Sequence, residues 1–312
     1  MYNSLDFHAL PGLASPHLQT IMAVFGQKGA PPPSQKLLVA LEDGDQLSCQ
    51  VSIPPGWNEQ HKTIALIHGL GGSHESNYIV RMSRRLHAAG RKVVRINLRG
   101  CGSGKGLAYL PYNAGTSLDI YSVLQELKKQ APKSPITLIG YSLGGNIALK
   151  LAGELGDTLC TYCDRIIAVC PPVDLFHTVQ ALTKGFNRFY ERYYLGNLLK
   201  QSPHWVMDQR IDSLHEFDDK ITALAWGYDS AEDYYDQSSA IRYASSIKQR
   251  CDILFSADDP IIDYHRIEKA MISPYTTVWL AKGGGHNGFL GWAGNNGIYW
   301  LDNQIYQWIS SS

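Results

Sequence analysis

The chain shows no excess of either charge and no long hydrophobic run. Lysine plus arginine number 28, and aspartate plus glutamate also number 28. This balance gives no reason to expect nucleic acid, an anionic membrane or a polyanionic substrate as a partner. No apolar stretch approaches the roughly 20 residues that a helix needs to span a bilayer. We therefore expect no transmembrane segment, with peripheral membrane contact left open.

Cysteines are few, and they are scattered. Six cysteines in 312 residues are typical of reduced intracellular thiols rather than of a disulfide framework. Cys160 and Cys163 form a C-x-x-C pair, but no second pair or suitably spaced histidine follows to complete a zinc site. The first residues also show no basic stretch followed by an apolar core, as a secretory signal would. We expect a cytoplasmic protein with no metal and no cofactor.

Short apolar strands alternate with helices over most of the chain. This rhythm predicts an α/β fold with a mostly parallel sheet and helices on both faces. An Asp-Gly turn at residues 43–44 also predicts an antiparallel hairpin near the start. The expected strands span residues 36–41, 46–53, 63–68, 92–97, 136–139, 165–170, 252–257 and 276–281; the expected helices span 16–25, 75–89, 117–130, the stretch after residue 142, and 299–309.

The alternation of strands and helices stops after Cys170. Residues 171–249 contain helix-forming segments with no clear core strand, and the strands then resume. We expect a single domain, residues 1–312, in which residues 171–249 form a helical cap. Such a cap would lie over the carboxyl ends of the strands, where open α/β sheets bind their ligands.

The most informative stretch is a Gly-Tyr-Ser-Leu-Gly sequence at the end of a predicted strand. Here Ser142 stands between Gly140 and Gly144, and a helix-forming segment follows. In a strand-turn-helix nucleophile elbow the serine adopts a strained backbone conformation, and small residues on either side keep strand and helix from colliding. The pattern therefore makes Ser142 a candidate nucleophile.

A serine nucleophile needs a base and a carboxylate that orients it. His286 lies in a glycine-rich loop directly after a predicted strand, and Asp258 and Asp259 follow the strand before it. The order Ser, Asp, His along the chain is the one that this architecture uses. We assign Asp259 as the acid because it directly precedes Pro and an apolar turn, with Asp258 as the alternative.

Two backbone amides are expected to stabilise the oxyanion of a tetrahedral intermediate. One is the amide of Leu143, directly after the nucleophile, and the other is that of Leu70, in the loop after the first parallel strand. His68, which begins this loop, is expected to support it rather than to transfer protons. The glycine-rich loop at residues 97–104 follows a predicted strand, as a phosphate-binding loop does. It lacks the Gly-Lys-Ser/Thr ending of such a loop, so we do not assign it that role.

These residues together resemble the α/β-hydrolase superfamily and, within it, the YheT-like group of esterases. The superfamily resemblance rests on residues 68–72, 99–102, 140–145, 259–260 and 285–286, and the narrower one on residues 16–21, 97–101 and 187–190. The resemblance implies a serine carboxylesterase acting on acyl esters, with eukaryotic relatives that hydrolyse or form medium-chain esters or cleave phospholipid acyl chains. Asn97 stands where many members carry Asp, which leaves the triad assignment unaffected.

The expected function is hydrolysis of short- to medium-chain acyl esters through an acyl-enzyme, with a small apolar ester as substrate. Aromatic residues recur at helical spacing in the cap, and their shared face either roofs an acyl pocket or packs on the sheet domain. Two other functions stay open: acyl transfer to an alcohol with the same triad, and a non-catalytic binding module on this fold. The aromatic residues are Phe186, Phe189, Tyr190, Tyr193 and Tyr194.

Overall fold

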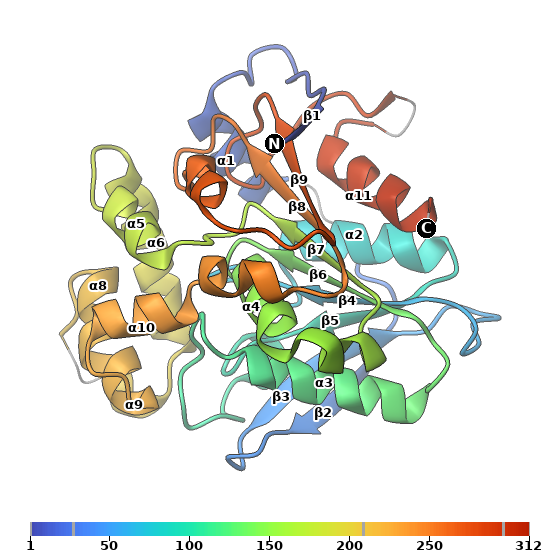
Figure 1. Ribbon diagram of the computed structural model, residues 1–312, viewed down its shortest axis with the longest axis horizontal. Coiled ribbons are helices and arrows are strands. Elements are labelled where there is room, and N and C mark those ends of the chain that lie inside the picture. Colours follow the sequence, from blue (N-terminus) through green and yellow to red (C-terminus); the bar gives the residue numbers. More distant parts are fainter. Residues whose placement is uncertain (1, 27–28, 208–209, 295–296, 312) are drawn as a thin grey trace.

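A nine-stranded sheet forms the centre of the protein (Figure 1). The computed structural model describes residues 2–26, 29–207, 210–294 and 297–311. Within them the strand order is β1-β9-β8-β7-β6-β4-β5-β3-β2. The strands are β1 (Asn3–Leu5), β2 (Gln35–Ala40), β3 (Gln46–Ser52), β4 (Thr63–Ile67), β5 (Lys92–Ile96), β6 (Ile136–Tyr141), β7 (Arg165–Val169), β8 (Arg250–Ser256) and β9 (Thr276–Ala281).

The sheet is mostly parallel, as predicted. Strand β3 is antiparallel to both of its neighbours, β2 and β5, and the other pairings between these strands are parallel. The chain runs from β4 outward to β5 and then returns to place β6 on the other side of β4. The loops after β4 and β6 therefore leave the sheet at a topological switch point, where such sheets bind ligands.

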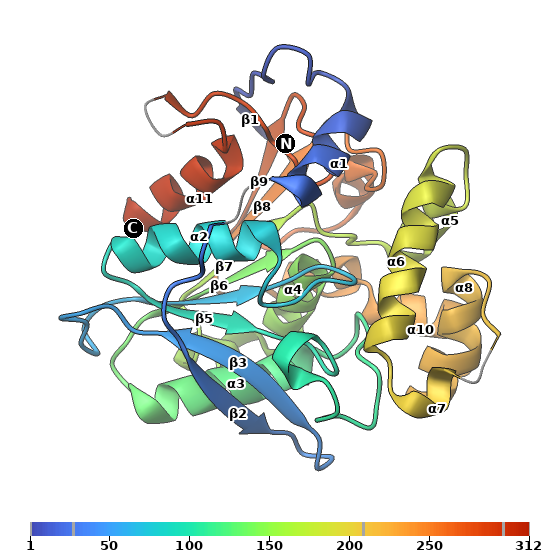
Figure 2. The same ribbon diagram turned by 180° about the vertical axis from the view of Figure 1, so that it is seen from behind.

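Helices cover both faces of the sheet. Helices α2 and α11 lie on one face and α3 and α4 on the other (Figure 1, Figure 2). The helices are α1 (Pro16–Phe25), α2 (Asn77–Ala88), α3 (Ser117–Gln130), α4 (Leu143–Leu155), α5 (Leu175–Leu182), α6 (Asn187–Gln201), α7 (His204–Met207), α8 (Leu214–Phe217), α9 (Leu224–Trp226), α10 (Ala231–Ser238) and α11 (Trp300–Ser310). None in the described residues is long and apolar enough to cross a membrane.

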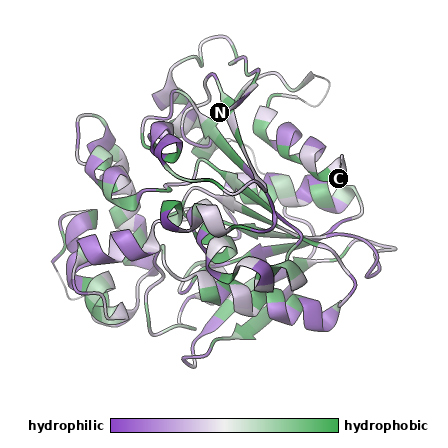
Figure 3. Cartoon of the chain, in the orientation of Figure 1, coloured by the Kyte–Doolittle hydropathy of each residue, from purple (hydrophilic) through white to green (hydrophobic). Residues whose placement is uncertain are grey.

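Alternate residues of the central strands fill two separate cores. In β4, Ile64 and Leu66 pack with the side chains of α2 and α11, whereas Ala65 and Ile67 pack with those of α3 and α4. All four are fully buried. Figure 3 shows the hydrophobic residues concentrated along the strands between the two helical layers. Burial of both faces explains why these strands read as continuous apolar runs rather than as alternating ones.

Helices α5 to α10, which we call the cap helices, lie between β7 and β8 in the chain. They form a group at one side of the sheet, at the left of Figure 1. Between α8 and α9, residues Asp218–Ala223 adopt a π-helix. No strand interrupts this part of the chain within the described residues, in agreement with the change of pattern after Cys170.

One feature at the start of the chain differs from the sequence expectation. Strand β1, which was not predicted, pairs in parallel with β9 at the edge of the sheet. Three residues are too few to show a period, so this strand is defined by its partner. Ser15 holds the cap position of α1, with Pro16 as the first helical residue, but its side chain makes no capping hydrogen bond.

Candidate active site

Ser142 stands in a sharp turn between β6 and α4. Its backbone has φ 51° and ψ −119°, a conformation that costs a non-glycine residue free energy and persists only where the surroundings impose it. The neighbouring glycines allow the turn to close. A Cβ atom on Gly140 would lie 2.1 Å from the carbonyl oxygen of Gly144, and one on Gly144 would lie 2.6 Å from that of His68. Both positions therefore exclude any larger residue.

The structure brings together the three residues that the sequence singled out. The Ser142 hydroxyl lies 2.9 Å from Nε2 of His286. Nδ1 of the same ring lies 2.8 Å from Oδ2 of Asp259. Asp259 and His286 are almost completely buried, with side chains only 1% and 5% exposed. Each of the three follows the carboxyl end of a strand, namely β6, β8 and β9.

The neighbouring carboxylates Asp258 and Asp259 have different partners. Asp259 contacts the His286 ring with one oxygen, and its other oxygen accepts from the amides of Ile261 and Ile262. Asp258 instead accepts from the amide of Gly285 and from a serine hydroxyl. Asp259 therefore orients the imidazole ring, while Asp258 holds the backbone of the loop that carries it.

The two residues expected to supply the oxyanion amides both lie beside Ser142. Leu143 is the first residue of α4, and the amides of a first helical turn have no acceptor within their own helix. Leu70 lies in the loop after β4 and lines the same space as Ser142. Hydrogen bonds hold the residues on either side of Leu70 in place. The Gly69 amide donates to the Tyr78 hydroxyl, and the Gly71 amide donates to the Tyr112 hydroxyl.

His68 supports this loop in its neutral form. Its Nε2 accepts from the amide of Leu98, so Nδ1 carries the proton and donates to the carbonyl of Gly69, 2.8 Å away. Burial lowers the pKa of His68 to about 4. A ring that is uncharged and fully hydrogen-bonded at neutral pH fits a supporting role and not proton transfer.

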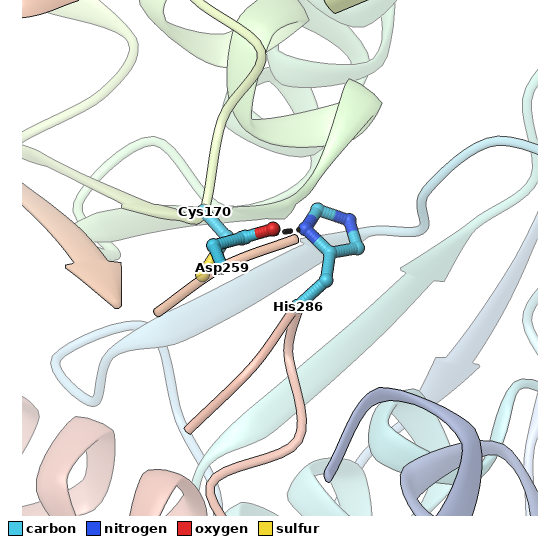
Figure 4. A group of neighbouring side chains, drawn as sticks. All are labelled: Cys170, Asp259 and His286. Atoms are coloured by element: carbon cyan, nitrogen blue, oxygen red, sulfur yellow. Dashed lines mark hydrogen bonds and ion pairs between the residues drawn. The ribbon is translucent and has the colours of Figure 1, made fainter. Parts of the chain in front are cut away.

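Two members of the triad and Cys170 form a group of three potential metal ligands. Cys170, Asp259 and His286 offer ligand atoms within 4.8 Å of one another (Figure 4). Burial raises the pKa of the Cys170 thiol well above its ordinary value, and the charge of Asp259 raises it further. A cation here would require the thiolate and would replace the hydrogen bond between Asp259 and His286. The donor set is therefore better suited to holding the histidine than to binding a metal.

An apolar cavity opens beside Ser142 and His286, under the cap helices. Its walls come mainly from aliphatic side chains of α5 and α6 and from the turn after Asp259. Representative residues are Leu175, Val179, Leu182, Leu198, Ile261 and Ile262. A second, more polar hollow also borders Ser142 and lies between α1 and the loop after β4. The candidate nucleophile thus stands where two different environments meet.

The aromatic face predicted for the cap is divided in the structure. Tyr194 lines the apolar cavity, as expected of a roof. Tyr190 is buried, and its hydroxyl lies 2.9 Å from Nδ1 of His17 on α1. The other three, Phe186, Phe189 and Tyr193, are 54%, 55% and 46% exposed. Helical spacing placed these residues on one broad surface, but only its edge reaches the cavity.

Two residues of α1 hold the histidine loop, although sequence reasoning gave them no role. The Thr20 hydroxyl accepts from the His286 amide at 2.9 Å. The Gln19 side chain bonds both the amide and the carbonyl of Leu290, at 2.7 and 3.0 Å. Both residues are buried on a helix whose Leu18, Met22 and Val24 are exposed. Their burial is known only from the structure; the sequence showed only that both lie in residues 16–21, part of the stretches on which the YheT-like resemblance rests.

Comparisons with known proteins identify the family to which this fold belongs. A model described as "alpha/beta hydrolase fold" matches residues 62–291. The chain is 29% identical to "Putative esterase YheT" of Escherichia coli, over 99% of this chain and 94% of that protein. It is 26% identical to "Phospholipase ABHD3" of Mus musculus, over 87% of this chain and 70% of that protein. The predicted resemblance to YheT-like proteins is thereby confirmed.

Solved structures show the same fold. An esterase of Pyrococcus furiosus, Pf2001, superposes with a TM-score of 0.59 over 89% of this chain and 92% of its own. The two sequences are only 16% identical, so this similarity bears on the fold alone. It agrees with the predicted mostly parallel sheet flanked by helices.

Proposed function

This chain belongs to the α/β-hydrolase family, and we propose that it is a serine ester hydrolase that works through an acyl-enzyme. The observation that carries the proposal is the unbroken hydrogen-bonded chain from Ser142 through His286 to Asp259. A serine hydroxyl becomes a useful nucleophile only when a base can take its proton. The buried carboxylate holds that base in the correct tautomer and orientation.

The proposed reaction has two halves. Oγ of Ser142 attacks the ester carbonyl carbon while Nε2 of His286 takes the hydroxyl proton, and the carbonyl oxygen becomes an oxyanion held by the amides of Leu143 and Leu70. The intermediate collapses, the C–O bond breaks, and the alcohol leaves with the proton from His286. Water then attacks the acyl-enzyme with His286 again as base, the bond between the acyl carbon and Oγ of Ser142 breaks, Oγ regains the proton from His286, and the free acid leaves.

The two hollows suggest how the ester lies. The apolar cavity is suited to the acyl chain, and the more polar hollow is suited to the leaving alcohol. This orientation supports a short- to medium-chain acyl ester as the substrate. The similarity to "Putative esterase YheT" and to a phospholipase supports an ester as the substrate. We also propose that residues 171–249 act as a cap within one domain.

Replacement of the nucleophile tests this function. Ser142→Ala should abolish hydrolysis of p-nitrophenyl butyrate, a loss of at least about 10⁴-fold, because the whole triad acts as a unit. The wild-type protein should be labelled by a fluorophosphonate probe, and the variant should not. Thermal unfolding of both proteins serves as the control for folding. A folded Ser142→Ala protein that retained activity would disprove the assignment, and a wild type that resisted the probe would favour a binding module.

Product analysis separates hydrolysis from acyl transfer. Both reactions pass through the same acyl-enzyme, and they differ in whether water or an alcohol accepts the acyl group. In the presence of ethanol we expect free acid as the main product. Ethyl ester as the main product would instead identify an acyltransferase.

A further inference from the structure

Helix α6 of the cap packs against the loops that follow β4 and β5 (Figure 2). Glycines stand at both contacts. A Cβ atom on Gly71 would lie 2.7 Å from the Cβ of Asn197, and one on Gly100 would lie 2.4 Å from the carbonyl oxygen of Gln201. The lack of side chains at these two positions allows the last turns of α6 to lie directly on the edge of the sheet that carries Ser142.

The loop after β4 contains a tight turn that includes Leu70, the residue proposed to supply the second oxyanion amide. The Gly72 amide donates to the carbonyl of Gly69 at 3.0 Å, which makes Leu70 and Gly71 the two central residues of a β-turn. Gly71 has φ 70°, close to the value that the third residue of a type II turn requires. The direction of the Leu70 amide therefore depends on how this turn is held.

One side chain of the cap holds this turn at two points. Nε2 of Gln201 donates to the carbonyl of Gly72 at 2.9 Å. Oε1 of Gln201 accepts from the Tyr112 hydroxyl at 3.1 Å, and that hydroxyl accepts from the Gly71 amide at 2.9 Å. Gln201 is the last residue of α6. The end of a cap helix is thus bonded to both residues that follow Leu70, to one directly and to the other through a hydroxyl group.

The Gln201 side chain lies outside both spaces proposed for the substrate. It lines neither the apolar cavity nor the polar hollow. It is also joined to the loop after β5, because the Cys101 thiol donates to Oε1 at 3.5 Å. A residue that meets no substrate but fixes the oxyanion turn can change the rate of the reaction without changing how the substrate binds.

We propose that Gln201 is a positioning residue for the oxyanion hole, through which the cap takes part in catalysis as well as in substrate recognition. The inference rests on the proposed ester hydrolysis and on the Leu70 amide as an oxyanion donor. The bonds of Gln201 keep the turn, and with it this amide, in one orientation. A donor that is already fixed stabilises the developing oxyanion without a cost of reorganisation. A looser turn would weaken that stabilisation in the transition state, while the ester would bind as before.

Gln201→Met tests this role, because methionine keeps the length of the side chain and removes both hydrogen-bonding atoms. With p-nitrophenyl butyrate, kcat should fall about tenfold to a hundredfold, and KM should change less than about twofold. Titration of the active sites with a fluorophosphonate ensures that misfolded protein is not counted as lost activity. Lys200→Met is the matched control, because it places methionine at the adjacent, exposed residue, and its kcat should be unchanged.

A transition-state analogue separates a weakened oxyanion hole from a general loosening of the cap. The serine of such an enzyme adds to an alkyl trifluoromethyl ketone, and the ketone oxygen becomes an oxyanion like that of the reaction. Its Ki should rise in Gln201→Met by the factor by which kcat/KM falls. A fall in kcat/KM with an unchanged Ki, an unchanged kcat, or a rise in KM alone would overturn the inference and leave the ester hydrolase standing. A wild type that hydrolysed no ester would overturn both.

Tyr112→Phe provides a second variant and carries the test if Gln201→Met fails to fold. It removes the hydroxyl that links the Gly71 amide to Gln201, and kcat should fall by a similar factor. Where both fold, the double variant should lose at most about twice as much as the weaker of the single variants, because the two side chains act on one turn. Losses that multiply would show that they act independently and would overturn the shared role.

Discussion

The two walls of the cavity beside Ser142 are built on different principles. On the sheet side, the backbone conformation fixes the positions of the side chains at and near the triad. Four non-glycine residues of the described chain have positive φ, namely Ser142, Cys170, Asn287 and Phe289, and all four lie at or near the triad. On the cap side, ordinary helices present side chains, and none of the described non-glycine residues there has positive φ.

This difference separates the reaction from the choice of substrate. Proton transfer requires atoms fixed within a fraction of an ångström, which backbone strain and glycine contacts provide. Recognition of the substrate's acyl chain requires only that side chains of suitable size and polarity face the cavity. We therefore expect substitutions on the sheet wall to affect catalysis or folding, and those on the cap wall to affect selectivity.

The largest expected effect within the sheet wall is the loss of the triad carboxylate. Asp259→Asn should lower kcat by roughly 10⁴-fold, because an amide no longer holds His286 in the tautomer that accepts the serine proton. Steady-state kinetics with p-nitrophenyl butyrate measures the change. Asp258→Asn is the matched control, because Asn retains an oxygen that can accept from Gly285. Equal losses in the two variants would contradict the assignment of Asp259.

The same glycine substitution in the two regions should have opposite effects on stability. Gly144→Ala forces a Cβ atom to 2.6 Å from a carbonyl oxygen, which should cost about 3 kcal/mol or more of unfolding free energy. Gly196→Ala in α6 meets nothing within 4 Å and should stabilise the protein by about 0.5–1 kcal/mol. Urea denaturation measures both. A tolerated Gly144→Ala would show that the elbow is less constrained than its contacts indicate.

A smaller effect is expected from the support behind the sheet wall. Thr20→Val keeps the shape of the side chain but removes the oxygen that accepts from the His286 amide, and kcat should fall about tenfold to a hundredfold through misplacement of the ring. KM should change less than kcat, since Thr20 lines the polar hollow proposed for the leaving alcohol but not the apolar cavity proposed for the acyl chain. Thr20→Ser restores the oxygen and should restore kcat. If serine failed to rescue activity, Thr20 would act by packing alone.

The smallest expected effect is a pH dependence of protein stability that comes from Asp218 in the cap wall. Asp218 has its pKa raised from 3.8 to about 7 in the folded protein, so between these values the folded state binds more protons than the unfolded state. Its contribution to stability is therefore present at low pH and is lost as the pH rises through about 7. Burial raises the pKa of this carboxyl group, and the Tyr235 and Thr222 hydroxyls and the charge of His215 oppose that shift.

Thermal unfolding at pH 5 and pH 8 measures this contribution. The Tm of the wild type relative to that of Asp218→Asn should be higher at pH 5 than at pH 8. Asp219→Asn is the matched control, because it makes the same change at the exposed neighbouring residue. A difference between wild type and Asp218→Asn that stayed constant with pH would mean that this carboxyl group titrates normally.

The positions of Ser142, Asp259 and His286 could be predicted from the sequence because each follows a strand that is itself easy to recognise. The buried parallel strands are apolar runs bounded by glycine or proline, and their carboxyl ends meet at one edge by topology. The structure places all three side chains within hydrogen-bonding distance of one another along one chain. Their catalytic roles await the experiments above.

Contacts between distant segments could not be predicted in this way. Strand β1 is defined by β9, and the role of Thr20 by His286, a residue 266 positions away. The cavity beside Ser142 is lined by Asn113 and Asp218, which come from separate elements, the loop before α3 and the π-helix. Neither residue stands in a motif, and a lone Asn or Asp in a helix-rich segment is ordinarily a surface residue.

The bond between Thr20 and His286 also has a consequence for how the protein is made. A ribosome adds about 5–20 residues per second, so the 266 residues between them take about 13 to 53 s to synthesise. During that interval α1 and β1 have emerged, but the loop and the strand that they contact do not yet exist. Assembly of the histidine loop is therefore a late step, and a nascent chain stalled before β9 should be inactive even with its elbow complete.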